Sequence, residues 1–251
     1  MTDGLAGVVL AAGAGTRLRP LTLLRPKALC PVGNVPLVDL AIERLRGLDV
    51  DVDVAVNVHH GRAEMEAHLG GSVHLSFEDG RLLGTAGALG HLRGWLDGRN
   101  ALVVNADAWC PGSLAPLVDG WDGARVRLLL AGEDQLTPTS RIAGALMPWS
   151  SIASLEAAPS GLYEVAWAPA QLAGQLEGVR HDGPFVDCGT PAQYLAANLA
   201  ASGGMSVVAE GAVVAGDVDR CVVWSEGIVR PDESLSCAIR ASAVVTVLVR
   251  P

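Results

Sequence analysis

The stretch from Val8 to Lys27 holds the residues of this chain best suited to bind phosphate. Two glycines, Gly13 and Gly15, follow a short apolar run and let the backbone turn sharply beside a ligand. Backbone amides in such a turn form a cradle for an anion. Four cationic side chains follow within reach of the turn: Arg17, Arg19, Arg25 and Lys27. The pattern predicts a phosphate-binding loop, and a basic surface loop after a strand is the simpler alternative.

Lys27 is the only lysine among the 18 basic residues of the chain. Lysine presents a compact ammonium and arginine a planar fork, so the two are not equivalent phosphate ligands. The exception indicates a site that requires an ammonium, with chance placement as the alternative.

The spacing excludes two better-known glycine loops. A Walker loop needs Lys and Ser or Thr directly after its last glycine, whereas Thr16 and Arg17 follow Gly15. A dinucleotide fingerprint needs a third glycine at position 18, which is Leu18, so a dinucleotide-dependent oxidoreductase is disfavoured.

The pattern Gly-x-Gly-Thr-Arg-x-x-Pro, with Pro26-Lys27 shortly after it, resembles the sugar-1-phosphate nucleotidyltransferase family. The resemblance implies that Arg17 and Lys27 hold the triphosphate and the incoming sugar phosphate. It also implies that the glycine loop wraps the nucleotide through Leu10, Ala11, Ala12, Gly13, Gly15 and Thr16.

Two aspartates far apart in the sequence complete the expected phosphate site. Asp107 ends an apolar strand, and Asp187 lies in Asp-Cys-Gly-Thr-Pro, which matches the family's Asp-x-Gly-Thr-Pro block. An acid at the carboxyl end of a strand is well placed to hold Mg²⁺ against phosphate oxygens. The resemblance implies that both aspartates bind Mg²⁺, and the alternative is that they cap helices or form turns.

A second glycine-bearing turn, from Glu78 to Leu89, enters a helix expected to run to about Leu96 with Thr85 as its cap. Its run Leu-Leu-Gly-Thr-Ala-Gly-Ala-Leu is most like mannose-1-phosphate guanylyltransferases and muramate-1-phosphate uridylyltransferases. By that resemblance Glu78, Gly84 and Thr85 would line the nucleobase. An ordinary helix cap is the alternative.

The region from about 133 to 165 departs from the family pattern. Relatives usually carry a Glu-Lys-Pro element and an Asn-x-Gly turn around the sugar. Here no lysine is available, Arg141 is a substitute that cannot be aligned firmly, and Ser160-Gly161 stands where the turn is expected. The implied sugar-binding residues are Gly144, Ser160 and Gly161.

Apolar periodicity predicts alternating strands and helices with short connections. This order predicts an α/β, Rossmann-like, mostly parallel sheet with helices on both faces, whose ligands bind beyond the carboxyl ends of the strands. The His59-His60 pair at one strand end is assigned a structural role in preference to metal or acid-base work. The expected strands are Val8–Leu10, Asp51–Val58, Val73–Phe77, Ala101–Asp107, Val126–Leu130, Ile142–Met147 and Ser160–Trp167, and the expected helices are Leu37–Leu48, Arg62–Leu69, Thr85–Leu96 and Pro169–Leu176.

From Met205 onward the sequence shows a different spacing of its aliphatic residues. Aliphatic residues recur at steps of six, at Val208 and Val214 and again from Val223 to Leu235, with glycines between them. This pattern predicts a short left-handed β-helix of hexapeptide repeats. Residues 1–203 are accordingly expected to form the catalytic domain and residues 204–251 the β-helix. So few coils must dock on the catalytic domain or on another subunit. Several relatives that carry this appendage form oligomers through it, so the resemblance implies a homo-oligomer.

Charge and composition narrow the class of protein. The net charge of -9 argues against nucleic acid or an anionic membrane as partner, because both require a basic face. Residues 1–35 nevertheless carry four cations and one acid, which suits a small phosphorylated ligand. The five cysteines contain no Cys-x-x-Cys pair and are expected to be reduced. With no long apolar run and no leader pattern, we expect a cytoplasmic protein.

The residues and the resemblance together predict an enzyme that condenses a sugar 1-phosphate with a nucleoside triphosphate. GTP with a mannose- or heptose-type sugar phosphate is favoured. The alternatives are uridylyl or thymidylyl transfer to another sugar phosphate, or a non-catalytic subunit of the same fold that senses a nucleotide-sugar.

Overall fold

The computed structural model describes residues 4–48 and 52–249. The chain divides into two compact units. The first comprises the residues up to Gly13 together with Val38–Ala106 and Cys110–Phe185, and the second comprises Ala14–Leu37, Asp107–Trp109 and the chain from Val186 onward. This division differs from a boundary at residue 203, which stays a prediction.

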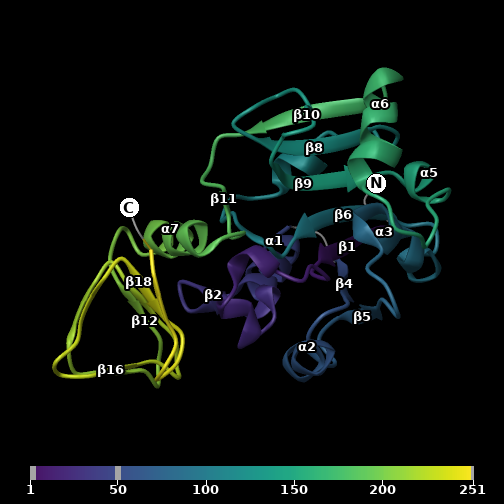
Figure 1. Ribbon diagram of the computed structural model, residues 1–251. Helices are drawn as coiled ribbons and strands as arrows, with labels where there is room; N and C mark the ends of the chain where they lie inside the picture. Colours follow the sequence, from purple (N-terminus) through teal and green to yellow (C-terminus); the bar gives the residue numbers. More distant parts are fainter. Residues whose placement is uncertain (1–3, 49–51, 250–251) are drawn as a thin grey trace. The chain divides into compact units, whose positions relative to one another are not determined.

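A seven-stranded sheet forms the first unit (Figure 1), in the order β10-β8-β9-β6-β1-β4-β5. The pairs that β9 makes with β6 and β8 are antiparallel, and the other neighbouring pairs are parallel. The predicted α/β fold with a mostly parallel sheet is therefore confirmed. The strands are β1 (Leu5–Leu10), β4 (Asp53–Val58), β5 (His74–Phe77), β6 (Asn100–Asn105), β8 (Val126–Ala131), β9 (Ile142–Met147) and β10 (Leu176–His181).

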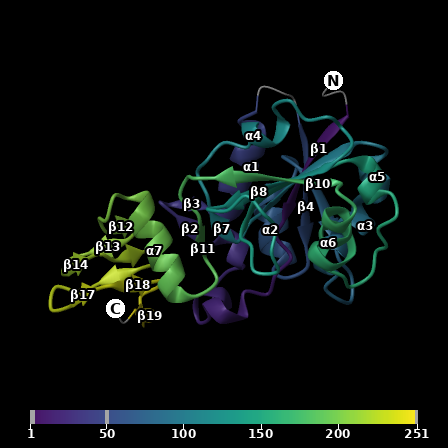
Figure 2. The ribbon, with the colours of Figure 1, turned by 90° about the horizontal axis from the view of Figure 1, so that it is seen from above.

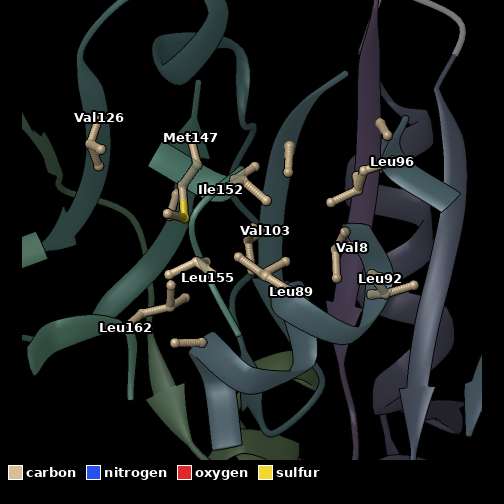
Figure 3. Packing of buried hydrophobic residues seen from close by; sticks show 14 of the residues in the cluster. Val8, Leu89, Leu92, Leu96, Val103, Val126, Met147, Ile152, Leu155 and Leu162 are labelled. Carbon is tan, nitrogen blue, oxygen red and sulfur yellow. The ribbon is translucent and has the colours of Figure 1, made fainter. Parts of the chain in front are cut away.

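Helices cover both faces of this sheet because successive side chains of a strand point to opposite sides. In β1, a Cβ added at Gly7 would lie 3.0 Å from Leu45 Cδ1, so α1 (Leu37–Arg46) packs on that face. Val8 points the other way, into a core with Leu89 of α3 (Gly84–Leu96) (Figure 3). Figure 2 shows the helices arranged around the sheet. The remaining helices of the unit are α2 (Arg62–Leu69), α4 (Ala115–Val118), α5 (Trp149–Ile152) and α6 (Ala168–Leu172).

Three glycines let α3 pack directly on the backbone of the segment 156–160. A Cβ added at Gly84 would lie 2.5 Å from the carbonyl oxygen of Ser160, one at Gly87 would lie 2.3 Å from that of Ala158, and one at Gly90 would lie 2.3 Å from that of Glu156. Real side chains do not tolerate such distances from backbone atoms, so the close approach requires glycine at all three positions.

The Gly90→Ala substitution is expected to destabilise the protein by at least about 1–3 kcal/mol, because the added methyl group overpacks a fixed backbone contact. Gly94 in the same helix is the matched control, since a Cβ there would meet no described atom within 4 Å. Gly94→Ala should stabilise by about 0.5–1 kcal/mol through helix propensity. Urea unfolding of the two variants measures both changes, and equal stability of the two would contradict this packing.

The predicted strand over 160–167 is wrong. Tyr163–Trp167 form a short π-helix that continues into α6, and the predicted helix ends at Leu172, followed by the unpredicted strand β10. Short apolar runs do not distinguish strand from helix by composition. The helical conformation wins because Tyr163, Ala166 and Trp167 then share one face and pack on the core of the first unit.

The C-terminal part of the second unit is built from short strands that pair in parallel, except that β19 pairs antiparallel with β18. Helix α7 (Pro191–Ala201) precedes them, and Thr190 caps it by accepting a hydrogen bond from the amide of Gln193. Three small sheets follow, seen in Figure 1 as the sides of a triangle. The strands are β12 (Val207–Val208), β15 (Val222–Val223), β18 (Ala238–Arg240) and β19 (Thr246–Leu248) in one sheet, β13 (Val213–Val214) and β16 (Ile228–Val229) in the second, and β14 (Asp217–Asp219) and β17 (Ser234–Ser236) in the third.

The spacing between paired strands is shorter than a strict hexapeptide repeat. Val207 pairs with Val222 and Asp217 with Ser234, which are 15 and 17 residues apart in the sequence. Three hexapeptides per turn would separate partners by about 18 residues.

The five cysteines are free thiols, as predicted. Burial raises the pKa of Cys30 and of Cys188 to about 12, so both stay protonated at neutral pH. Among the described residues, no helix is both long and apolar enough to cross a bilayer.

Candidate active site

Lys27 lies between the two aspartates that the sequence singles out. It opens the 3-10 helix η3 (Lys27–Leu29), and its Nζ lies 3.2 Å from Asp107 Oδ2 and 3.9 Å from Asp187 Oδ1. The lysine side chain is only 9% exposed, whereas the side chains of Asp107 and Asp187 are 50% and 36% exposed. The ammonium is therefore held inside the protein while both carboxylates remain open to a ligand.

A short antiparallel strand pair brings the two aspartates together. Asp187 in β11 (Val186–Asp187) faces Ala108 in β7 (Ala108–Trp109), and the amide of Cys188 donates to the carbonyl of Asp107 at 2.9 Å. Carboxylates 80 residues apart in the sequence thus become neighbours. This pairing belongs to the second unit and is separate from the large sheet.

Gly189 brings the guanidinium of Arg17 to the same place. A Cβ added at Gly189 would lie 3.0 Å from Arg17 Nη2 and 3.1 Å from both carboxylate oxygens of Asp187. A side chain at this position would press on these groups, so glycine leaves them room to converge. Arg17, Lys27, Asp107 and Asp187 therefore gather in one unit, with two positive and two negative charges.

The backbone of Gly15 packs closely against the side chains of Lys27 and Thr22. Its φ is +60°, and an added Cβ would lie 2.8 Å from Thr22 Cγ2 and 2.9 Å from Lys27 Cβ. The hydroxyl of Thr22 donates to the carbonyl of Gly15 at 2.9 Å. The need for glycine here comes from the protein's own packing as well as from any ligand.

The pair of carboxylates fits Mg²⁺. This ion prefers oxygen ligands and is commonly held by one or two carboxylates together with water and substrate phosphates. Asp107 and Asp187 supply that donor set, and Lys27 already places one positive charge against it. Within residues 4–48 and 52–249, no group of three or more His, Cys, Asp or Glu side chains is arranged to hold a metal by itself.

In the first unit, Glu78 is the centre of a buried hydrogen-bond chain. It is 2% exposed and accepts from Asn57 Nδ2 at 2.7 Å and from the amide of Leu83 at 2.8 Å. Asn57 in turn accepts from the amide of Ala11 through its Oδ1 at 2.7 Å. Glu78 thus ties the turn before α3 to the first residues of the glycine loop. Asn57, which the sequence analysis did not single out, is the link between them.

Replacing Glu78 with alanine should lower the free energy of unfolding by roughly 2–4 kcal/mol, because two buried donors lose their acceptor. Glu64→Ala on the exposed side of α2 is the control and should change stability by less than about 0.5 kcal/mol. Chemical denaturation of both variants tests this. A Glu78→Ala protein as stable as the control would show that these hydrogen bonds do not stabilise the fold.

The predicted cap of α3 is wrong. The N-cap position is Leu83, and no side chain caps the helix there. Thr85 Oγ1 instead accepts from the amide of Leu162 at 2.8 Å. The amide of Ala86 donates to the carbonyl of Ser160, whose own amide donates to Leu83. The start of α3 is therefore stabilised by the segment that follows residue 159.

A cavity of about 310 Å³ lies in the first unit beside this contact. Two of the predicted sugar-binding residues, Gly144 and Gly161, line it together with Thr85 and Leu10, whereas Ser160 is not part of the lining. The π-helix supplies Tyr163, Glu164 and Trp167 to one wall. The mostly apolar lining with a few polar groups is typical of a small-molecule pocket.

The rest of the predicted glycine loop is placed as follows. Ala12 is buried, a Cβ at Gly13 would meet nothing within 4 Å among the described atoms, and Thr16 is exposed at the start of the 3-10 helix η1 (Thr16–Leu18). His59 bonds to the carbonyl oxygen of Glu78 at 2.9 Å through Nδ1, in keeping with a structural role. The contacts of all these residues with ligands stay predictions.

Comparisons with known proteins show which family part of the chain resembles and which solved structures share its fold. Residues 6–126, just under half of the chain, match the model of the family described as nucleotidyl transferase. The family resemblance found in the motifs is thereby confirmed.

Three relatives show what the chain is similar to. It is 32% identical over 123 residues to mannose-1-phosphate guanylyltransferase of Mycobacterium tuberculosis, a match that covers 47% of this chain and 34% of the relative. It is 36% identical over 135 residues to N-acetylmuramate alpha-1-phosphate uridylyltransferase of Caulobacter vibrioides, covering 49% and 55%. It is 37% identical over 123 residues to mannose-1-phosphate guanyltransferase of Kluyveromyces lactis, covering 46% and 34%. The chain thus spans about a third to about a half of the length of these curated relatives.

Two solved structures share the fold. The crystal structure of mannose-1-phosphate geranyltransferase from Thermus thermophilus matches with a TM-score of 0.71 at 18% identity, over 98% of this chain and 95% of that chain. The UDP-glucose pyrophosphorylase from Acinetobacter baumanii matches with a TM-score of 0.62 at 15% identity, over 78% and 92%.

Proposed function

We propose that the protein is an enzyme that joins a sugar 1-phosphate to the nucleoside monophosphate part of a nucleoside triphosphate. An oxygen of the sugar phosphate attacks the α-phosphorus, a new P–O bond forms, and the bond to the β-phosphate breaks. The products are a nucleotide-sugar and pyrophosphate. The observation that carries this proposal is the convergence of Lys27, Arg17, Asp107 and Asp187 in the second unit.

The main barrier to this reaction is the repulsion between two negatively charged substrates, and the attacking oxygen needs no activation. A phosphate oxygen is already ionised at neutral pH, so no general base is required. Two polyanions repel each other, and catalysis of phosphoryl transfer is mainly positioning and charge stabilisation. Lys27 and Arg17 would neutralise phosphate oxygens and hold the attacking oxygen in line.

Asp107 and Asp187 would hold Mg²⁺. When bound, the ion would supply further positive charge to the phosphates of the nucleotide. The two carboxylates would orient it, and Lys27 would exchange its contact with them for one with substrate phosphate.

For the substrates, we favour GTP with a mannose- or heptose-type sugar 1-phosphate. The support is the turn at Gly84-Thr85 and the two relatives named as acting on mannose 1-phosphate. A uridylyltransferase is the next candidate, since the relative of Caulobacter vibrioides carries that name. Thymidylyl transfer to another sugar phosphate is a further alternative.

A pyrophosphate-release assay tests the proposal. GTP, UTP, dTTP, CTP and ATP are each supplied with a panel of sugar 1-phosphates and Mg²⁺, and we expect release with one nucleotide above the others. Asp107→Asn protein, assayed at the same concentration, excludes a contaminating enzyme. Binding of a nucleotide-sugar without any release would instead support a non-catalytic sensor. The departure of residues 133–165 from the family pattern allows that alternative, whereas the presence of Lys27, Asp107 and Asp187 together argues for catalysis.

We further propose that residues 204–251 form a left-handed β-helix of hexapeptide type and that the protein is a cytoplasmic homo-oligomer assembled through it. The parallel pairing of β12–β15–β18 and of β13–β16 supports such a coil. The acidic net charge supports small phosphorylated substrates as partners in place of nucleic acid or membrane.

A further inference from the structure

The segment 25–34, which carries Lys27, is held at its first residue by the turn between β15 and β16. Arg25 Nη2 donates to both carboxylate oxygens of Glu226, at 3.0 and 2.9 Å. The same guanidinium lies over the indole of Trp224, 4.2 Å from its ring centroid. The sequence predicts Arg25, two residues before Lys27, as one of the phosphate ligands. In the structure its guanidinium is instead paired with the carboxylate of Glu226.

The far end of the segment is held by the same tryptophan through a tyrosine. Trp224 Nε1 donates to the hydroxyl of Tyr194 at 3.0 Å, and that hydroxyl donates to the carbonyl of Pro31. The two rings meet edge to face at 6.4 Å. Trp224 is 1% exposed and Tyr194 is fully buried, so neither side chain moves without disturbing the packing around it.

Helix α7 and the first C-terminal strand add two contacts just beyond Pro31. The amide of Gly33 donates to Asn198 Oδ1 at 3.1 Å, and Asn34 Nδ2 donates to the carbonyl of Val208 at 3.1 Å. Tyr194 and Asn198 are four residues apart and share one face of α7. Both ends of the segment 25–34 are thereby attached to parts of the chain more than 160 residues away.

We propose that Trp224 and Glu226 are positioning residues for Lys27, so that the C-terminal coil is part of the catalytic machinery and not only an appendage for assembly. This inference rests on the proposed function. Trp224 and Glu226 fix Arg25, Tyr194 fixes Pro31, and the 3-10 helix that begins at Lys27 is suspended between these two points. A misplacement of about 1 Å in a catalytic group can cost about a hundredfold in rate, so loosening either point should be visible in turnover.

The energetics separate this role from a merely structural one. The Arg25–Glu226 pair is partly exposed, with side chains 25% and 58% accessible, and exposed ion pairs contribute only about 0–1 kcal/mol to stability. Loss of the pair should therefore leave the melting temperature nearly unchanged, but it should displace Lys27 and so lower kcat/KM. If the pair did not position Lys27, its loss would change neither the melting temperature nor kcat/KM.

The first test compares Glu226→Gln with Glu233→Gln. Glu233 also pairs with an arginine of the coil, Arg240, and its carboxylate hydrogen-bonds within the coil, to Arg240 and to the amide of Arg230. We expect Glu226→Gln to lower kcat/KM about tenfold at an unchanged melting temperature, and Glu233→Gln to keep wild-type kcat/KM. Equal kcat/KM in the two variants would overturn the proposal.

A double-mutant comparison shows whether the effect passes through Lys27. Residues that act as a unit give non-additive losses. In the Lys27→Ala background, Glu226→Gln should cause no further loss of kcat/KM. A full further tenfold loss would mean that Glu226 acts elsewhere, and the positioning role would be refuted.

A third measurement does not depend on activity. Trp224→Phe keeps an aromatic ring at the site but removes the donor to Tyr194 together with part of the ring, and hydrogen exchange at the amides of Leu29 and Cys30 should then become faster than in the wild type. These amides close the 3-10 turns at 2.9 and 3.0 Å. If the wild type releases no pyrophosphate, the proposed function fails but this exchange still decides the contact. Unchanged exchange in Trp224→Phe and Glu226→Gln would overturn the inference.

Discussion

Lys27→Ala is expected to lower turnover by at least about a hundredfold while the protein stays folded. Removal of a single preorganised charge from a site of this kind commonly has an effect of this size. The fold should survive because the two carboxylates left behind are 50% and 36% exposed and can be hydrated. No other lysine exists in the chain to take its place.

Asp107→Ala should have an effect of the same size, because it removes one of the two oxygen donors proposed for Mg²⁺ and leaves the buried ammonium of Lys27 with Asp187 alone at 3.9 Å. Steady-state pyrophosphate release at saturating substrates measures both variants, with circular dichroism to confirm the fold. Asp182→Ala is the control, since Asp182 is largely exposed and pairs only with Arg180 among the described residues. Near-normal turnover in pure Lys27→Ala or Asp107→Ala protein would refute the site.

Gly15→Ala is expected to lose both stability and activity. The residue has a φ of +60°, which costs a non-glycine residue about 1–2 kcal/mol. The added Cβ would also overlap Thr22 Cγ2 at 2.8 Å and Lys27 Cβ at 2.9 Å. Relief of that overlap pushes the backbone of Lys27 away from the aspartates, so we expect a loss of about a hundredfold in turnover and about 2–4 kcal/mol in stability.

The neighbouring glycine provides the contrast. Gly13 has no positive φ, and a Cβ there would meet no described protein atom within 4 Å, so Gly13→Ala should unfold at the same denaturant concentration as the wild type. Any loss of activity in Gly13→Ala would then report the approach of a ligand. Equal stability of Gly13→Ala and Gly15→Ala would show that the contact between Gly15 and Lys27 is not made in solution.

Features written in consecutive residues could be predicted well. The strand Val126–Ala131 follows from a short, nearly continuous apolar run, because all of its residues are buried. The helix Arg62–Leu69 follows from the helical spacing of its buried residues, Met65 and Leu69. The glycine loop, Lys27 and the two aspartates could be named for the same reason, since motif and spacing are local properties. Their residue types are the basis of the proposed phosphate and Mg²⁺ binding.

Long-range contacts could not be predicted, because nothing in a residue's own neighbourhood states which distant partner it meets. Gly87 and Gly90 looked like helix residues of weak propensity, and only the backbone at 156–160 explains them. Thr85 was expected to cap α3, but its hydroxyl oxygen accepts a hydrogen bond from the amide of Leu162, a residue far along the chain. Glu78 looked like a ligand of the nucleobase, although Asn57 and Leu83 engage both of its carboxylate oxygens.

The sequence by itself was enough to predict the mostly parallel sheet and to name the residues proposed to bind phosphate. Only the tertiary structure decided that β7 and β11 place Asp107 beside Asp187, and that Arg25 is held by Glu226 instead of remaining free for a ligand. The physical reason is that a charged side chain pairs with the opposite charge that lies nearest to it in space. The distance between two such charges depends on how distant segments pack together, which local sequence patterns do not reveal.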